Sequence, residues 1–225
     1  GILLYADDIM LLAPTVTALQ IMLVACELEL KSIGMQINVQ KSACMRFGNR
    51  YDSPCSSIIS LSGNTLKWVT SFKYLGIVIV SGKRFRCLFD ACKKKFFGSF
   101  NAIFGRVGRF ASEEVILHLI RTKCLPVLLY AIEACPLLSR DVHSFEFVIN
   151  RCLMKLFKTS SIVVVNECCD FFGFTPIRLT IETRTVKFLE RYISSENIVC
   201  SCFARFATAQ LNGLRRAFAA DMPIL

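Results

Sequence analysis

The sequence lacks any stretch of about 18 uncharged apolar residues, although 54% of its 225 residues are hydrophobic and its mean hydropathy is +0.51. A transmembrane helix needs about 20 predominantly apolar residues, so we expect no membrane span and no membrane partner. The nearest candidate, CLPVLLYAIEACPLL (residues 124–138), is short and contains Pro126, Glu133 and Pro136. We therefore expect this stretch to be a buried helical segment.

The sequence also lacks a secretory signal and any C-x-x-C pair. Its N-terminus has neither a basic start nor a small-residue cleavage site, so we expect an intracellular protein. The sequence starts at Gly1 and not at Met, so we expect a fragment. Twelve cysteines are present, and without a secretory signal reduced thiols are expected. A zinc site stays possible, but buried apolar thiols fit the irregular cysteine spacing better.

Acidic residues are scarce relative to basic ones: 17 Asp and Glu stand against 27 Lys and Arg, and the net charge is +10. Most of this excess lies in residues 83–110, where Asp90 is the single acid and phenylalanines alternate with the basic residues, among them Phe85, Phe89, Phe96, Phe97 and Phe100. The pattern predicts a helix with an aromatic buried face and a basic outer face. Such a face suits nucleic acid or, equally, simple solvation. The basic residues are Lys83, Arg84, Arg86, Lys93, Lys94, Lys95, Arg106 and Arg109.

The first 80 residues alternate between strand and helix patterns. Two short strands are expected in residues 1–13, and a helix follows, with Thr15 as its N-cap and Gly34 as its stop. Strand character returns in residues 35–47, interrupted by a loop at 38–41. A turn in SGNT then separates two further strands, and SFKYLGIVIV (residues 71–80) is the strongest single strand.

After Gly82 almost everything has helical periodicity, so we place a domain boundary near Ser81–Gly82. The expected fold class is α+β: a mixed or antiparallel sheet with one covering helix, followed by an all-helical region. The predicted helices cover residues 83–104, 112–134, 139–158, 175–195 and 197–219.

Two adjacent aspartates, Asp7 and Asp8, interrupt the apolar run GILLYADDIMLLAP between the first two predicted strands. Buried carboxylates are costly unless paired or bound to a metal, so a turn that lifts them to one edge is expected. A solvated hairpin tip explains them. So does a metal-binding hairpin for two-metal phosphoryl transfer, although that chemistry requires at least one more carboxylate from another strand.

The order of motifs resembles a known family. YADD in ILLYADDIMLLA, then GMQINVQKSACMRF, then FKYLGIVI resemble successive palm motifs of the reverse transcriptases of non-LTR (LINE-like) retrotransposons. CLPVLLYAIEACPLL and FVINRCLMKLF resemble the helical thumb and connecting segment that follow the palm. The resemblance implies the rear of a palm in residues 1–81 and a helical thumb and connection in 82–175. It leaves the helical residues 176–225 without a role.

The resemblance also implies roles for individual residues. Asp7 matches the family's metal-binding carboxylate and Asp8 its catalytically important neighbour, with Mg²⁺ as the cofactor. Tyr5 and Ala6 match positions against the primer terminus. Lys41 matches a catalytic lysine proposed to protonate or steady the departing pyrophosphate, although its spacing in the sequence alone favours an ordinary surface loop lysine.

Further positions match nucleic-acid-binding parts of the family. The motif Lys73, Tyr74, Leu75 and Gly76 matches the primer grip, and Gly76 would either admit a nucleic-acid backbone or mark a β-bulge. The implied partners are an RNA template, a DNA primer and deoxynucleoside triphosphates, and the family implies residence in the nucleus. The residues expected to contact phosphates are Lys83, Arg84, Arg86, Lys93 and Lys94.

The sequence departs from the family pattern in three ways. The palm strand with the third carboxylate and the fingers precede the YADD hairpin in the family, and this sequence starts at the hairpin, so we expect the chain alone to be inactive. The family usually has glycine where Ala131 stands and tryptophan where Cys135 stands. An inactive nucleic-acid-binding remnant is therefore the alternative, and a helical protein-interaction domain is a third, weaker one.

Overall fold

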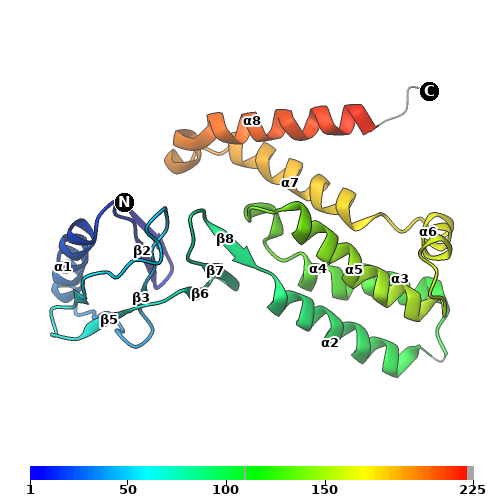
Figure 1. The fold of residues 1–225 in the computed structure, drawn as a ribbon, viewed down its shortest axis with the longest axis horizontal. Coiled ribbons are helices and arrows are strands. Elements are labelled where there is room, and N and C mark those ends of the chain that lie inside the picture. Colours follow the sequence, from blue (N-terminus) through cyan, green and yellow to red (C-terminus); the bar gives the residue numbers. More distant parts are fainter. Residues whose placement is uncertain (109, 222–225) are drawn as a thin grey trace. The chain divides into compact units, whose positions relative to one another are not determined.

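A computed structural model describes residues 1–108 and 110–221, the last four of these by their backbone only, so Arg109 lies outside the described residues. The chain divides into two compact units, Gly1–Leu88 and Phe89–Leu225 (Figure 1). The first contains short strands and one helix, and the second is helical. The expected α+β class is confirmed.

The first unit opens with a β-hairpin and a helix. Strands β1 (Ile2–Tyr5) and β2 (Asp8–Leu11) pair antiparallel, and helix α1 covers Val16–Ser32. The Thr15 hydroxyl accepts a hydrogen bond from the Ala18 N–H at 3.1 Å, and Gly34 follows the helix with φ +73°. Both predicted helix ends are confirmed, because an N-cap oxygen and a left-handed glycine satisfy the unpaired groups of a helix.

Helix α1 packs on a small mixed sheet, in which β5 (Thr65–Trp68) runs parallel to β3 (Ala43–Cys44) and antiparallel to β4 (Ile58–Ile59). One cluster forms the core between helix and sheet, with Leu11 of the hairpin packed against it. Its buried members are Leu23, Cys44, Ile58 and Leu66.

The remaining strands form an antiparallel sheet of β6 (Ser71–Tyr74), β7 (Ile77–Val80) and β8 (Arg86–Leu88). The prediction of one continuous strand over residues 71–80 is wrong: the segment is a hairpin. Leu75 and Gly76 have φ of +45° and +85°, the backbone signs of a type I′ turn, which matches the twist of paired strands. The single predicted sheet is likewise divided into three small ones.

The predicted helix over residues 83–104 begins later than expected. Residues 86–88 pair with β7 as a third strand, and helix α2 covers Asp90–Val107. The division between the units accordingly falls after Leu88, seven residues beyond the predicted boundary. Tertiary pairing of Cys87 opposite Ile79 overrides the local helical pattern here.

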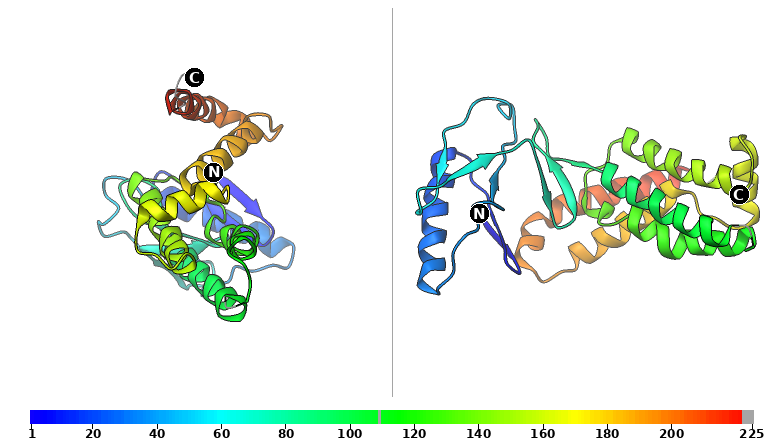
Figure 2. Two further views of the ribbon diagram at one scale, coloured as in Figure 1. Left: turned by 90° about the vertical axis from the view of Figure 1, so that its right-hand side faces the viewer. Right: turned by 90° about the horizontal axis from the view of Figure 1, so that it is seen from below.

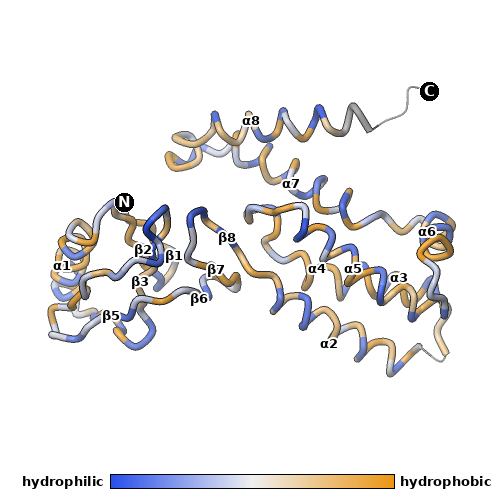
Figure 3. Tube along the Cα trace, viewed as in Figure 1, coloured by the Kyte–Doolittle hydropathy of each residue, from blue (hydrophilic) through white to orange (hydrophobic). Residues whose placement is uncertain are grey.

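The second unit consists of helices α2 to α8 with two short irregular helical segments (Figures 1 and 2). Apolar and polar residues alternate along α2 and α5 (Figure 3), and the apolar side of each is buried. After α2 the elements are α3 (Glu113–Leu119), the π-helical η1 (Ile120–Cys124), α4 (Leu125–Leu128), the 3₁₀-helical η2 (Ile132–Ala134), α5 (Ser139–Leu156), α6 (Ile162–Phe171), α7 (Ile177–Ile193) and α8 (Ile198–Asp221).

The predicted helix over residues 112–134 is broken into α3, η1, α4 and η2. Pro126 has no N–H to bond the fourth residue before it, and its ring crowds that carbonyl, so the turns before it widen into a π-helix. Helix α4 ends at Leu128, and Ala131, with φ +53°, precedes η2. Helix α6 was not predicted, whereas the predicted helices at 139–158, 175–195 and 197–219 are confirmed within a few residues.

By length and composition alone, Glu113–Ala134 is apolar enough to cross a membrane, with a mean hydropathy of 1.7. Core helices of other proteins pass the same test. Seven of its side chains are at most 2% exposed and pack in the second unit, as expected for a buried segment. They are Ile116, Leu117, Ile120, Cys124, Leu128, Leu129 and Ile132.

Helices α7 and α8 form an antiparallel pair at the end of the chain (Figure 2). Leu189 of α7 and Ala207 and Leu211 of α8 form its buried contact. The Nε and Nη2 of Arg184 in α7 donate to the carboxylate of Glu133 in η2, at 3.0–3.3 Å, and so anchor the pair to the rest of the unit.

Candidate active site

The YADD motif forms the tip of the first hairpin. Tyr5 pairs with Asp8, and Ala6 and Asp7 are the two turn residues between them. Ala6 has φ +51°, a left-handed conformation that costs an L-residue about 1–2 kcal/mol. The two-residue turn holds both carboxylates at the end of the strands, outside the apolar core.

Strand register places Asp8 and Tyr5 on one face of the hairpin, because directly opposite residues share a face. Leu11, on the other face of β2, packs toward α1 and its cluster. Asp7 and Asp8 are both exposed, and neither carboxylate makes a hydrogen bond or an ion pair with another described residue. Two acceptor-only groups therefore stand side by side with all their lone pairs open to a ligand.

This pair fits part of a two-metal centre and not the whole of one. A two-metal site needs several carboxylates converging on ions about 3.5–4 Å apart. Within the part of the chain that the structure describes, no three His, Cys, Asp or Glu side chains lie together as a metal site. Asp7 and Asp8 therefore supply only two of the carboxylates that a two-metal centre needs.

Lys41 lies in a turn of the same unit. Its backbone N–H bonds both the carbonyl oxygen and the Oδ1 of Asn38, at 3.1 and 3.2 Å, and the Ser42 hydroxyl bonds the same carbonyl. The predicted loop at residues 38–41 is confirmed. Ile37 and Val39 anchor the turn in the core, while the Lys41 side chain is exposed and carries a mobile ammonium on a fixed backbone.

The four residues that match a primer grip lie together in the β6–β7 hairpin. Lys73 and Tyr74 end β6, with the Lys73 side chain exposed and Tyr74 half-buried. Leu75 and Gly76 form the turn, so the interpretation of Gly76 as a bulge is wrong: it is a turn glycine. Leu75 is 42% exposed at the tip.

The basic residues of 83–110 are divided between the units. Lys83, Arg84 and Arg86 are exposed around the start of β8 in the first unit. On α2 in the second unit, Lys94 and Lys95 are exposed, whereas the Lys93 ammonium is engaged. It donates to Ser144 of α5 at 2.8 Å and to Asp90 at 3.2 Å, and its side chain is only 20% exposed.

Ala131 occupies a position at which the backbone favours glycine. Its φ of +53° is left-handed, and the family resembled by this sequence usually has glycine there. The structure therefore explains that preference: the chain reverses between α4 and η2, and a side chain at this point adds strain.

Two polar residues of α1 hold the first unit together. Sequence patterns identified neither of them as a candidate. The Gln20 amide donates to the Ile59 carbonyl at 2.7 Å and accepts from its N–H at 2.8 Å. Glu27, only 9% exposed, accepts a hydrogen bond from the Leu61 N–H at 2.9 Å. The loop that contains Leu61 covers Glu27, so this carboxylate is a buried acceptor for the backbone.

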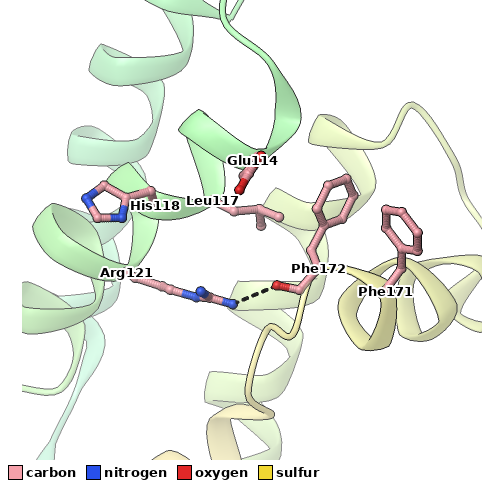
Figure 4. Close-up of a pocket in the computed structure, with 6 residues that line it drawn as sticks. All are labelled: Glu114, Leu117, His118, Arg121, Phe171 and Phe172. Atoms are coloured by element: carbon pink, nitrogen blue, oxygen red, sulfur yellow. Dashed lines mark hydrogen bonds between the residues drawn. The ribbon is translucent and has the colours of Figure 1, made fainter.

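A pocket of about 350 Å³ lies within the second unit between α3, η1 and the end of α6 (Figure 4). Glu114, His118 and Phe171 are among its lining residues. Its Arg121 donates to the carbonyl oxygens of Phe172 and Gly173 and lies 5.2 Å from the centre of the Phe174 ring. The arginine thereby serves the α6–α7 connection, so we assign it a structural role.

Comparisons with known proteins bear on the first unit. Neither the curated proteins nor the solved structures provided a match to this chain. Residues 1–79, about a third of the chain, match the family model described as reverse transcriptase (RNA-dependent DNA polymerase).

Proposed function

We propose that this chain is part of an RNA-directed DNA polymerase of a LINE-like retrotransposon, with the YADD hairpin in the palm and the second unit as thumb and connection. The observation that carries the proposal is the exposed Asp7–Asp8 pair in a hairpin turn, within the segment that matches the reverse transcriptase family. The parent reaction adds deoxynucleotides to a DNA 3′ end along an RNA template, and Mg²⁺ would supply activation of that hydroxyl and charge stabilisation.

Within this proposal each described residue has a limited role. Asp7 and Asp8 supply two of the carboxylates, and Tyr5 with Ala6 borders the primer end. Lys41 stands ready as a counter-charge and proton donor for the leaving pyrophosphate. Lys73 and Tyr74 hold the primer backbone from the β6–β7 hairpin.

Helix α2 presents a surface that suits the sugar-phosphate backbone of a template–primer duplex. Lys94, Lys95 and Arg106 are exposed, and Gly98 and Gly105 follow Lys94 by four and eleven residues, on the same face of the helix. A Cβ atom built on either glycine meets no other atom within 4 Å, so the backbone here is open to close approach. Phosphate contacts of this kind give affinity without base specificity.

The second candidate function is a nucleic-acid-binding remnant without catalysis. It is favoured by one observation: the described residues bring no third acidic group to Asp7 and Asp8. Both candidates predict binding of an RNA–DNA hybrid, and only the first predicts that the hairpin supports nucleotide addition when the rest of a palm is present.

The deciding experiment is a chimera. Residues 1–80 replace the corresponding segment of an active LINE-like reverse transcriptase, and Mg²⁺-dependent primer extension is measured. We expect extension by the chimera and its loss, by at least a hundredfold, on Asp7→Asn. Asp52→Asn is the matched control, because Asp52 is an exposed loop aspartate of the same unit and has no assigned role. A folded but inactive chimera would establish the remnant instead.

Hybrid binding by the 225-residue chain tests the α2 surface separately. Affinity for an RNA–DNA hybrid should fall steeply between 50 and 200 mM salt, because phosphate contacts release counterions. The double change Lys94→Ala and Lys95→Ala should lower the slope by about 2, whereas Lys187→Ala on α7 should not. A flat salt response would contradict phosphate-driven binding.

A further inference from the structure

Helix α8 leaves one face uncovered. Ala207 and Leu211 pack on α7, and the side of the helix opposite to them is exposed. Ile198 lies on that side and is 77% exposed, and Val199 and Phe206 at its edge are 41% and 58% exposed. Phe203, four residues before Ala207, lies beyond the buried contact and is 53% exposed, with its ring beside that of Phe206. We define the outer face of α8 as Val199, Cys202, Phe203, Arg205, Phe206 and Arg216.

The charge of this face has one sign. Residues 198–217 include Arg205, Arg215 and Arg216 and contain no Asp or Glu. Arg215 is paired with Glu190 of α7 at 2.8 Å, whereas Arg205 and Arg216 lie on the exposed side of the helix. An anionic partner is therefore complementary to the outer face.

The exposed aromatic rings of α8 lie close to one of its arginines. The Arg205 guanidinium lies 4.7 Å from the centre of the Phe206 ring, and the Phe203 and Phe206 rings are 6.4 Å apart at 38°. Three and seven residues after Phe206, on the line that leads along the helix to Arg216, stand the exposed small residues Ala209 and Gly213, and a Cβ on Gly213 meets nothing within 4 Å. A flat ligand can approach the rings while a phosphate chain runs over the small residues toward Arg216.

We propose that the outer face of α8 binds single-stranded RNA, with unpaired bases stacked on Phe203 and Phe206 and phosphates contacted by Arg205 and Arg216. Exposed aromatic rings beside arginines are the usual composition of such surfaces, since every base offers a π-face and the backbone is anionic. A duplex keeps its bases stacked inside, so it cannot use the rings. The inference rests on the proposed function only in taking RNA as the strand.

The test measures affinity of the purified 225-residue chain for a 20-nucleotide oligouridylate and for an RNA–DNA hybrid, by fluorescence anisotropy. Phe206→Ala should weaken oligouridylate binding about tenfold and leave hybrid binding unchanged. Arg205→Ala should lower the salt slope for oligouridylate by about 0.7, whereas Phe206→Ala should leave the slope unaltered.

Phe171→Ala is the matched control, because Phe171 is an equally large ring, 84% exposed, on α6 of the same unit. All three side chains are exposed, and unchanged circular dichroism verifies the fold of each variant. Equal loss with Phe171→Ala, or no loss with Phe206→Ala, overturns the proposal. So does conversion of a dimer to a monomer by Phe206→Ala at unchanged RNA affinity, which would make the face a self-association surface.

The two proposals fail in different ways. If the chimera is inactive but Phe206→Ala weakens oligouridylate binding, the RNA site on α8 is supported and the polymerase function is refuted. An active chimera with no effect at Phe206 would do the reverse.

Discussion

The two units differ in how much core supports them. Among the described residues, five buried apolar side chains belong to the first unit and 23 to the second. Strand β1 of the first unit is exposed along its whole length, with Leu4 71% and Tyr5 63% accessible. The first unit, which contains Asp7 and Asp8, thus has the smaller hydrophobic core. The helical unit has most of the hydrophobic stabilisation.

This contrast predicts two unfolding transitions that can be separated by spectroscopy. Trp68, the single tryptophan, lies in β5 of the first unit, while most of the helix lies in the second. Tryptophan fluorescence should therefore report the first unit, and far-UV circular dichroism mainly the second. We expect the fluorescence midpoint in urea to come first.

The largest effect is expected from Phe145→Ala. Phe145 is completely buried in α5 and meets the ring of Phe89 edge-on at 5.3 Å. Its removal should cost about 3–5 kcal/mol through lost burial and a cavity, and should lower the circular dichroism midpoint. The Trp68 midpoint should not move. A common shift of both midpoints would show that the units unfold together.

Gln20→Ala tests the converse, a change in the first unit that should leave the unfolding of the second unit unaltered. It removes both hydrogen bonds to the Ile59 backbone, and we expect a loss of about 1–3 kcal/mol. The Trp68 transition should shift and the helical transition should stay. Gln210→Ala on α8, an exposed glutamine, is the control, and an equal effect there would refute the role given to Gln20.

Thiol reactivity compares the two cores directly. Burial raises the pKa of Cys44 in the first unit to about 11 and that of Cys152 in the second to about 12. At pH 8 both are almost wholly protonated, so Cys152 should react with a thiol reagent about tenfold more slowly than Cys44. Both rates should rise about tenfold per pH unit. The exposed Cys202 is the internal reference, and faster labelling of Cys152 would contradict the ranking.

The smallest effect is expected from Ala131→Gly. Glycine adopts the φ of +53° without strain, but it also gains freedom in the unfolded chain, so a net stabilisation of about 0.5–1 kcal/mol is expected. The free energy of unfolding measured for the helical unit by circular dichroism should rise by that amount. Ala102→Gly in α2, at an ordinary helical position, should instead destabilise the same transition.

Local signals in the sequence were reliable wherever one turn of chain decides the structure. Thr15 and Gly34 mark the two ends of α1 as predicted, and the aspartate pair of YADD lies at the tip of a hairpin, with Asp7 in the turn and Asp8 at the start of β2, as its apolar flanks indicated. The phenylalanine spacing of α2 predicted its buried side, and Phe96 and Phe100 are buried there. Phe85 belonged to the same pattern but is 48% exposed, because β8 separates it from the helix.

Sequence by itself determined the fold class, the ends of α1, the YADD turn and the loop at Lys41, because capping groups, turn residues and periodicity act over a few residues. Tertiary structure alone decided the rest. It made β8 a strand, buried Glu27 under a loop, tied Lys93 to Ser144 and left Phe203 and Phe206 uncovered. Each of these depends on which distant segment packs against the residue in question. The local residue pattern of one segment does not identify the segment that will contact it.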